Sequence, residues 1–158
     1  MTSWQHVWRL RACIPAVSDV LCDPPSWPRF LPHVPRVVTQ PDGSLALTVS
    51  WHGLRLTTRC HVTTAISATS CTLLLEHRAG LLRGLREEWI ATSPHEMQLT
   101  LHSDTTWTTP VSAARRVLAQ RVYIAGVMSA TAAQIALLAQ ADWRSRSAQT
   151  APDGTSAG

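Results

Sequence analysis

Apolar and polar residues alternate in short runs through the first two thirds of this chain. The runs are separated by turn-forming groups, among them Pro41-Asp42-Gly43, His52-Gly53 and Ala79-Gly80. Alternation is typical of strands that bury one face, and short turns join antiparallel neighbours. We therefore predict seven antiparallel strands, at residues 4–12, 36–40, 45–51, 54–64, 71–78, 81–92 and 97–107.

The last long segment, residues 109–143, follows a helical period instead. Thr109 is a good N-cap and Pro110 suits the first helical position. At about 100° per residue, one arc is apolar and includes Met128, while Arg121 is a charged residue on that same arc. The helix spans about 50 Å, so it needs a broad surface to pack on, and a curved sheet provides one.

Between the first two strands the chain is rich in proline. A short helix is predicted at residues 16–22, and the five prolines from Pro24 to Pro35 allow only about one helical turn. We expect this segment to form an ordered cap over a ligand site, with Trp27 and Phe30 at its rim.

Composition indicates a single globular domain. The chain has 158 residues, of which 45% are hydrophobic and 15% charged, so residues 1–143 suit one domain with a substantial core. Residues 144–158, rich in Ser, Ala, Thr and Gly, are predicted to be a disordered tail. The net charge of +4 is spread along the chain, which argues against nucleic-acid binding. We see no signal-peptide pattern and no apolar run of about 20 residues, so we expect a cytoplasmic protein without stable membrane insertion.

Motifs for metal and cofactor chemistry are not found. The four cysteines have neither CxxC nor CxxH spacing, which argues against zinc and against a disulfide framework. The sequence contains no GxSxG, no HExxH and no glycine-rich phosphate loop. We expect no metal and no cofactor, so any chemistry must come from a pocket.

Two motifs resemble a known superfamily. Residues 13–16 (Cys-Ile-Pro-Ala), continuing through residues 23–34, resemble the opening of the SRPBCC, or START-like helix-grip, proteins. Residues 80–85 (Gly-Leu-Leu-Arg-Gly-Leu), with Trp89 and Pro94, look like a pattern of the polyketide cyclase and coenzyme Q-binding branches. The resemblance runs from about Trp4 to Trp143, although the segment between Pro15 and Asp23 is about four residues shorter than the family pattern.

The resemblance implies an α+β helix-grip fold. In that fold a curved antiparallel sheet of six or seven strands wraps around a long C-terminal helix, with an internal apolar cavity between them. A two-residue loop at His52-Gly53 would place Trp51 on the inner face, and the alternation of the last strand places Leu99 and Trp107 there. Leu75 and His77 are expected on the inner face of their strand.

The register of residues 81–92 is less well defined. A four-residue turn from Ser93 to Glu96 would pair Thr92 with Met97 and place Glu88 inward. A slip of one residue would instead turn Glu87 and Trp89 inward, so both arrangements stay open.

Three polar residues are candidates for catalysis inside the cavity. His77, Glu88 and Arg121 could meet there and move protons on a bound ketone. The alternatives are a half-exposed His77 at a hairpin end and a structural ion pair of Glu88 with Arg86 or Arg121. Arg59 matches by position an arginine that recurs in the family, but our register places it on the outer face of the sheet, in solvent.

Two functional hypotheses follow. The first is an enzyme resembling polyketide aromatase/cyclases, which folds a poly-β-ketone tethered to an acyl carrier protein and assists aldol closure and loss of water. The second is a non-enzymatic protein that binds or transports a quinone, a lipid or another hydrophobic metabolite. In both, the residues expected to line the ligand site are Trp27, Phe30, Trp51, Leu75, Trp89, Leu99, Trp107 and Met128.

Overall fold

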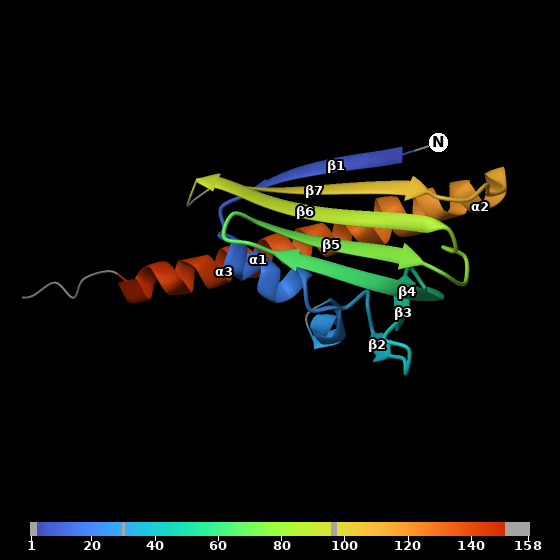
Figure 1. Cartoon of the computed structure of the whole chain (residues 1–158), viewed down its shortest axis with the longest axis horizontal. Coiled ribbons are helices and arrows are strands. Elements are labelled where there is room, and N and C mark those ends of the chain that lie inside the picture. The colour runs from blue at the N-terminus through green and yellow to red at the C-terminus, as the bar shows by residue number, and fades with distance from the viewer. Residues whose placement is uncertain (1–2, 30, 96–97, 151–158) are drawn as a thin grey trace, which may run out of the picture.

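The computed structural model describes residues 3–29, 31–95 and 98–150. Its centre is one antiparallel sheet with the strand order β1-β7-β6-β5-β4-β3-β2, shown in Figure 1. The strands are β1 Ser3–Leu10, β2 Arg36–Thr39, β3 Leu45–Trp51, β4 Leu54–Ile66, β5 Ser70–His77, β6 Leu85–His95 and β7 Gln98–Trp107. The prediction of a seven-stranded sheet with a long C-terminal helix is confirmed.

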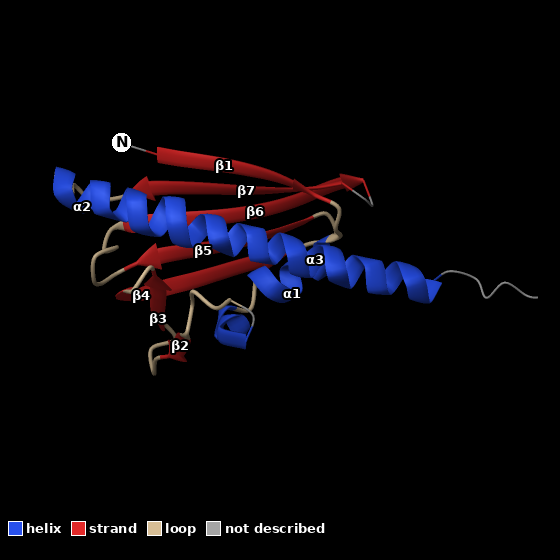
Figure 2. Ribbon diagram, turned by 180° about the vertical axis from the view of Figure 1, so that it is seen from behind, coloured by secondary structure: helices blue, strands red, loops and turns tan. Residues whose placement is uncertain are grey.

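One face of the sheet is crossed by a long helical segment, seen from its own side in Figure 2. The segment consists of α2 Ala113–Leu118, a π-helix η2 Ala119–Met128 and α3 Ser129–Thr150. Two shorter elements, α1 Ile14–Leu21 and the 3-10 helix η1 Pro24–Arg29, lie between β1 and β2 where a short helix and a cap were predicted. We call the face of the sheet that is covered by the helices the inner face.

Both ends of the long helix differ from the prediction. It begins after Ser112, whose hydroxyl accepts a hydrogen bond from the Arg115 N–H at 3.3 Å, and not after Thr109. Thr108 instead holds the turn before the helix, because its N–H donates to the Gly84 carbonyl at 2.7 Å. At the other end the helix continues to Thr150, so the prediction of a disordered tail is wrong for residues 144–150. Four of the seven residues from 144 to 150 are the helix-favouring Arg, Ala and Gln, and residues 151–158 lie outside the described residues.

The π-helix explains why only half of the predicted helical arc is buried. From Met128, the last residue of η2, onward the predicted arc is buried, as Ile135 and Ala139 show. Before η2, Val117 is 50% exposed, although a spacing of 100° per residue places it on the same arc as Met128. In a π-helix the hydrogen bonds run from residue i to i+5, so each turn holds more residues than an α-helical turn. A constant angle of 100° per residue therefore gives the wrong phase for the N-terminal half.

The register between β3 and β4 is as predicted. Trp51 pairs with Leu54 across a two-residue turn in which His52 and Gly53 have φ values of 47° and 82°. Positive φ at both positions is typical of a type I′ hairpin turn, which fixes the register of the two strands. The side chains of Leu47, Val49 and Cys60 point to the inner face and are buried.

Of the two registers that stayed open for β6, the structure has the one that turns Glu87 and Trp89 inward. A two-residue turn at Ala79-Gly80 would place Arg83 opposite Glu76, but the residue found there is Arg86, three positions later. The chain needs the longer connection because Gly84 also has positive φ, 88°, and its N–H bonds back to the His77 carbonyl. A shift by an odd number of residues exchanges the two faces of a strand, so Glu87 points inward and Glu88 outward.

The helix and the sheet approach each other closely where Gly126 meets Trp51. A Cβ at Gly126 would lie 2.6 Å from atoms of the Trp51 ring, so only glycine fits. Five residues further along the helix, His33 of the cap contacts the Thr131 hydroxyl through Nε2 at 2.6 Å. The helix Ala113–Asp142 is long and apolar enough to cross a membrane by length and composition alone, but half of its most apolar window is buried in the molecule. That burial is expected of a helix that packs on a sheet.

Candidate functional site

A buried polar network lies on the inner face, at the ends of β5 and β6. His77, the last residue of β5, has a side chain with 0% exposure. Its Nδ1 lies 3.0 Å from the Thr58 hydroxyl on β4, and its Nε2 lies 3.2 Å from Glu87 Oε2 on β6. Three neighbouring strands therefore contribute polar groups to one point in an otherwise apolar core.

Glu87 is the centre of this network. Its carboxylate is 3% exposed and faces three potential donors: His77 Nε2, the Trp89 indole N–H and the Tyr123 hydroxyl. The Tyr123 hydroxyl donates to Oε2 at 2.7 Å, and it comes from the π-helical turn. The phenol also packs edge-on against the His77 ring, with centroids 5.7 Å apart. The helix and the sheet are thus joined by polar contacts at a fully buried site.

The hydrogen-bond pattern restricts the protons in the network. The Thr58 hydroxyl, which has one hydrogen, donates to the Ala79 carbonyl at 3.0 Å. It can then only accept from His77, so Nδ1 carries a proton. The contact between His77 Nε2 and Glu87 Oε2 needs one further proton, which belongs either to an imidazolium or to a carboxylic acid. The pair is therefore a place where one proton can move between two groups.

Two neighbouring groups respond to the burial and to the charge of Glu87. Burial raises the pKa of Tyr123 well above its usual value, and the Glu87 carboxylate adds to this effect. Burial, followed by the charge of Glu87, raises the pKa of Cys60 to about 12. Tyr123 is therefore a hydrogen-bond donor at neutral pH, and Cys60 is a packed thiol and not a nucleophile.

The structure brings only one of the four predicted catalytic residues to the site. His77 is buried in the network, whereas Glu88 lies on the outer face opposite Asp104. Arg121 is exposed because the π-helix rotates it away from the sheet. Arg59 is exposed as well, and its guanidinium pairs with Asp42 at 2.7 Å. The Ser44 hydroxyl and that guanidinium hold the pKa of Asp42 well below its usual range, so the pair is a surface feature.

The predicted ligand-lining residues are mostly on the inner face. Leu75, Trp89, Leu99, Trp107 and Met128 are buried there, and Trp51 is half-buried against Gly126. Trp27 is 4% exposed and donates its indole N–H to the Val20 carbonyl at 2.9 Å, so it is a core residue and not an exposed rim residue. Phe30 lies outside the described residues.

Sequence reasoning missed Tyr123 and treated Glu87 only as an alternative. The one-residue slip that turns Trp89 inward was a usable signal for Glu87, because the two side chains share a face. Nothing in the apolar pattern signalled Tyr123, since its inward position depends on the π-helix. Thr58 was not recognised as a partner of His77.

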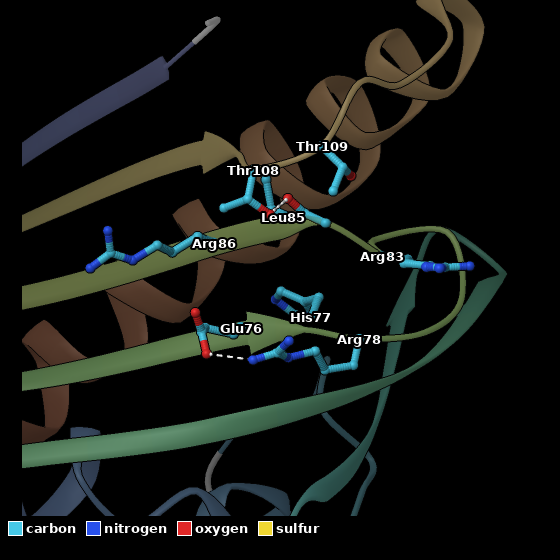
Figure 3. Close-up of a pocket in the computed structure, with 9 residues that line it drawn as sticks. Glu76, His77, Arg78, Arg83, Leu85, Arg86, Thr108 and Thr109 are labelled. Atoms are coloured by element: carbon cyan, nitrogen blue, oxygen red, sulfur yellow. Dashed lines mark hydrogen bonds and ion pairs between the residues drawn. The ribbon is translucent and has the colours of Figure 1, made fainter.

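Two hollows are lined by described residues, and His77 of the network is among the residues that line the larger one. One, of about 450 Å³, is at the end of the sheet near the start of the helix, where Arg78, Arg83 and Arg86 surround it together with Glu76, as Figure 3 shows. The other, of about 290 Å³, lies beside β2, β3 and β4. Neither is the internal apolar cavity that the family resemblance implies.

The connection between β5 and β6 is attached to the start of the helix. The Arg115 guanidinium donates to the carbonyls of Leu81 at 2.6 Å, Arg83 at 2.7 Å and Gly80 at 3.2 Å. It also lies 5.7 Å from the centre of the Trp107 ring. One side chain therefore closes this end of the space between sheet and helix.

Among the described residues, no group of three or more His, Cys, Asp or Glu side chains is placed to hold a metal ion.

Comparison with solved structures identifies the fold. The di-domain ARO/CYC StfQ from the steffimycin biosynthetic pathway is similar at a TM-score of 0.70 and 18% identity, over 89% of this chain and 51% of StfQ. The Zhui aromatase/cyclase from Streptomyces sp. R1128 matches at 0.65 and 20% identity, over 93% of this chain and 97% of that one. A START superfamily protein from Mycobacterium smegmatis matches at 0.57 and 12% identity, over 84% and 96%.

The fold is therefore the helix-grip fold of the ARO/CYC polyketide cyclases and START superfamily proteins. This chain spans about half the length of StfQ. No protein-family model and no curated protein matches its sequence. At these identities the similarity defines the architecture, and the activity has to be argued from the network.

Proposed function

We propose that this chain binds an apolar, ketone-bearing small molecule between the sheet and the helix and promotes its aldol cyclisation and dehydration. The activity is of the polyketide aromatase/cyclase type. The observation that supports it is the buried His77–Glu87–Tyr123 network, which combines a proton acceptor and two proton donors in a site without solvent.

The carboxylate of Glu87 has room for one more contact. A carboxylate offers about four lone-pair sites, and the network uses three. The fourth can accept a proton from a carbon that lies next to a carbonyl of the ligand. The enolate carbon then attacks a second carbonyl carbon, and the new alkoxide takes a proton from Tyr123, which recovers it from Glu87.

Loss of water uses the same groups. Glu87 takes a second proton from the ring carbon, and the hydroxyl leaves as water with a proton from Tyr123. Tyr123 recovers a proton from Glu87, to which it is hydrogen-bonded, and this restores the starting state; His77, which contacts the same carboxylate oxygen, can hold the proton in transit. Since aldol closure and dehydration involve no net oxidation or reduction, the proposed reaction needs no cofactor.

The proposed substrate is a poly-β-ketone presented as a thioester on an acyl carrier protein. Such carrier proteins are acidic, and the arginine-lined hollow of about 450 Å³ is a basic surface close to the end of the helix. Arg78 is already paired with Glu76 at 3.0 Å, which leaves Arg83 and Arg86 as the residues to face a carrier.

Heptane-2,4,6-trione is a simple probe of this chemistry, because aldol closure and loss of one water convert it into orcinol. The wild-type chain should accelerate orcinol formation, measured by chromatography, above the rate in buffer. Glu87→Gln should reduce the acceleration by about 10²-fold or more, as expected for loss of a general base. Glu88→Gln, the adjacent carboxylate on the outer face, should leave it unchanged. Equal rates for the two variants would contradict the proposal.

A non-enzymatic carrier is the second candidate, because the network also satisfies itself. Each of its groups has a partner in the protein, which is what a purely structural network requires. A carrier of a quinone or lipid would bind apolar probes with full affinity yet form no orcinol above background. That result would support carriage over catalysis.

A further inference from the structure

We propose that the Ser103 hydroxyl and the Trp107 indole N–H bind oxygen atoms of the ligand, so that the site selects a molecule with acceptor oxygens on both sides of Glu87. This inference rests on the proposed function and specifies its substrate class. Both residues lie on the inner face of β7, the neighbour of β6.

Both groups are buried and lack a partner in the described part of the chain. Ser103 is 0% exposed and Trp107 is 5% exposed, and neither Ser103 Oγ nor Trp107 Nε1 makes a hydrogen bond there. A buried polar group without a partner is unfavourable, and proteins rarely keep one without a reason.

Comparable residues nearby do have partners. Thr105 lies between the two on the same face of β7, and its hydroxyl donates to the Trp4 carbonyl at 3.3 Å. The indole N–H groups of Trp27 and Trp89 donate to a carbonyl and a carboxylate. Ser103 and Trp107 are therefore exceptions within a face that otherwise satisfies its polar groups.

Their positions relate directly to the proposed reacting centre. Across the β6–β7 ladder, Thr105 is opposite Glu87, Ser103 is opposite Trp89, and Trp107 is opposite Leu85. The two donors are thus placed symmetrically along the strand about the Glu87 position. Four residues of a strand span about 13 Å, so the two donors can hold oxygens well apart with a reacting carbon between them.

The inner face is less completely covered along β1 than elsewhere near the two donors. The side chains of Trp4, His6 and Trp8 point inward beside β7, yet all three are only half-buried. Figure 2 shows that the helix crosses the sheet diagonally and leaves much of β1 uncovered. The Trp8 and Trp89 rings stack at 5.9 Å with an interplanar angle of 8°, so a flat ligand entering here would meet an aromatic wall.

The chemistry of the donors defines what they bind. An indole N–H can only donate, and it needs an acceptor such as a ketone, ester or carboxylate oxygen. A plain hydrocarbon chain would leave both groups unpaired. A carbonyl-rich chain would satisfy them, and the same hydrogen bonds would polarise its carbonyls for enolisation.

The experiment compares 9-fluorenone with fluorene, which differ by one carbonyl and have nearly the same shape. Their affinities for the full chain are measured by displacement of 1-anilinonaphthalene-8-sulfonate. Wild type should bind 9-fluorenone about tenfold more tightly than fluorene, as one hydrogen bond would give. Ser103→Ala and Trp107→Phe should each reduce this ratio, and the double variant should bring it to about one.

Thr105→Val is the matched control, because its hydroxyl already has a partner. It should lower the melting temperature and leave the ratio unchanged. Ser103→Ala should melt no lower than wild type, which shows that the hydroxyl is not a structural partner. Equal binding of both probes by wild type, or a ratio that survives the double variant, would overturn the inference alone. If neither probe displaces the dye, the apolar site of the proposed function is overturned as well.

Discussion

Replacing Glu87 with glutamine, beside a matched replacement of Glu88, is the sharpest test of the network. Glutamine keeps the shape of the side chain but has one carbonyl oxygen and one NH2 group. Glu87 now makes contacts at both oxygens, with Trp89 at Oε1 and with Tyr123 and His77 at Oε2. In one orientation the amide NH2 group faces the Trp89 N–H, which can only donate; in the other it replaces the oxygen that Tyr123 and His77 contact, so either way the network loses a contact to a charged or acidic group.

The size of the effect follows from burial. The His77 and Glu87 side chains are 0% and 3% exposed, so solvent cannot compensate for a lost partner. Breaking a buried charge pair by changing one member typically costs about 3–5 kcal/mol. For a domain of this size that corresponds to a fall of about 6–20 °C in melting temperature. Glu88 is half-buried on the outer face, and Glu88→Gln should stay within about 0.5 kcal/mol of wild type.

Urea titration followed by circular dichroism measures the free energy of unfolding for both variants. Tyr123 and Glu87 share a hydrogen bond, so adding Tyr123→Phe to Glu87→Gln should cost less than the sum of the two single variants. Two results would refute the reasoning: a Glu87→Gln variant as stable as wild type, or a Glu88→Gln variant that loses more. Either would mean that β6 presents its other face to the helix.

Three further predictions concern other parts of the fold. Gly126→Ala should lower the free energy of unfolding by up to about 2 kcal/mol, because the new Cβ would meet the Trp51 ring. Alanine is the better helix former, so a variant that is more stable than wild type in urea titration would contradict this packing. Burial lowers the pKa of His33 from its ordinary 6.5, so the neutral imidazole stabilises the fold above pH 6.5 and this stabilisation is lost as the pH falls below that value. The melting temperature of wild type should therefore drop more in that range than the melting temperature of His33→Gln. The pKa of Cys60 is raised from 9.0 to about 12, so the protonated thiol stabilises the fold below pH 9 and this stabilisation is lost as the pH rises toward 12. Between these pH values the melting temperature of Cys60→Ala should therefore fall less than that of wild type. Equal falls in melting temperature would place the thiol in solvent.

The sequence predicted the architecture because its strands and turns carry local signals. The His52-Gly53 turn fixes the β3–β4 register through the conformations of these two residues. The inner positions of Leu75, Leu99 and Trp107 then follow from alternation alone. These features depend on neighbours in sequence, and local patterns suffice for them.

The candidate site was less predictable because it depends on two non-local choices. The connection between β5 and β6 is held by Arg115, a residue of the distant helix, and its length decides whether Glu87 or Glu88 faces inward. The position of Tyr123 depends on a π-helix, whose wide turns leave no clear mark on the apolar pattern. Both choices are made by tertiary contacts, and both affect the residues that matter most for chemistry.

The π-helical turn also has a consequence for insertions and deletions. Sequence changes in helices are usually substitutions, since removing one residue rotates everything on one side of the gap by about 100°. Here the long helix already has a wide turn at Ala119–Met128, so a deletion within it can be absorbed by a return to regular α-helix. The C-terminal half would stay seated on the sheet, while Val117 and Leu118, now 50% and 43% exposed, would turn toward it and Tyr123 would turn away from Glu87. A one-residue deletion at this place would therefore withdraw the phenol from the network while the polar residues of the sheet stayed where they are.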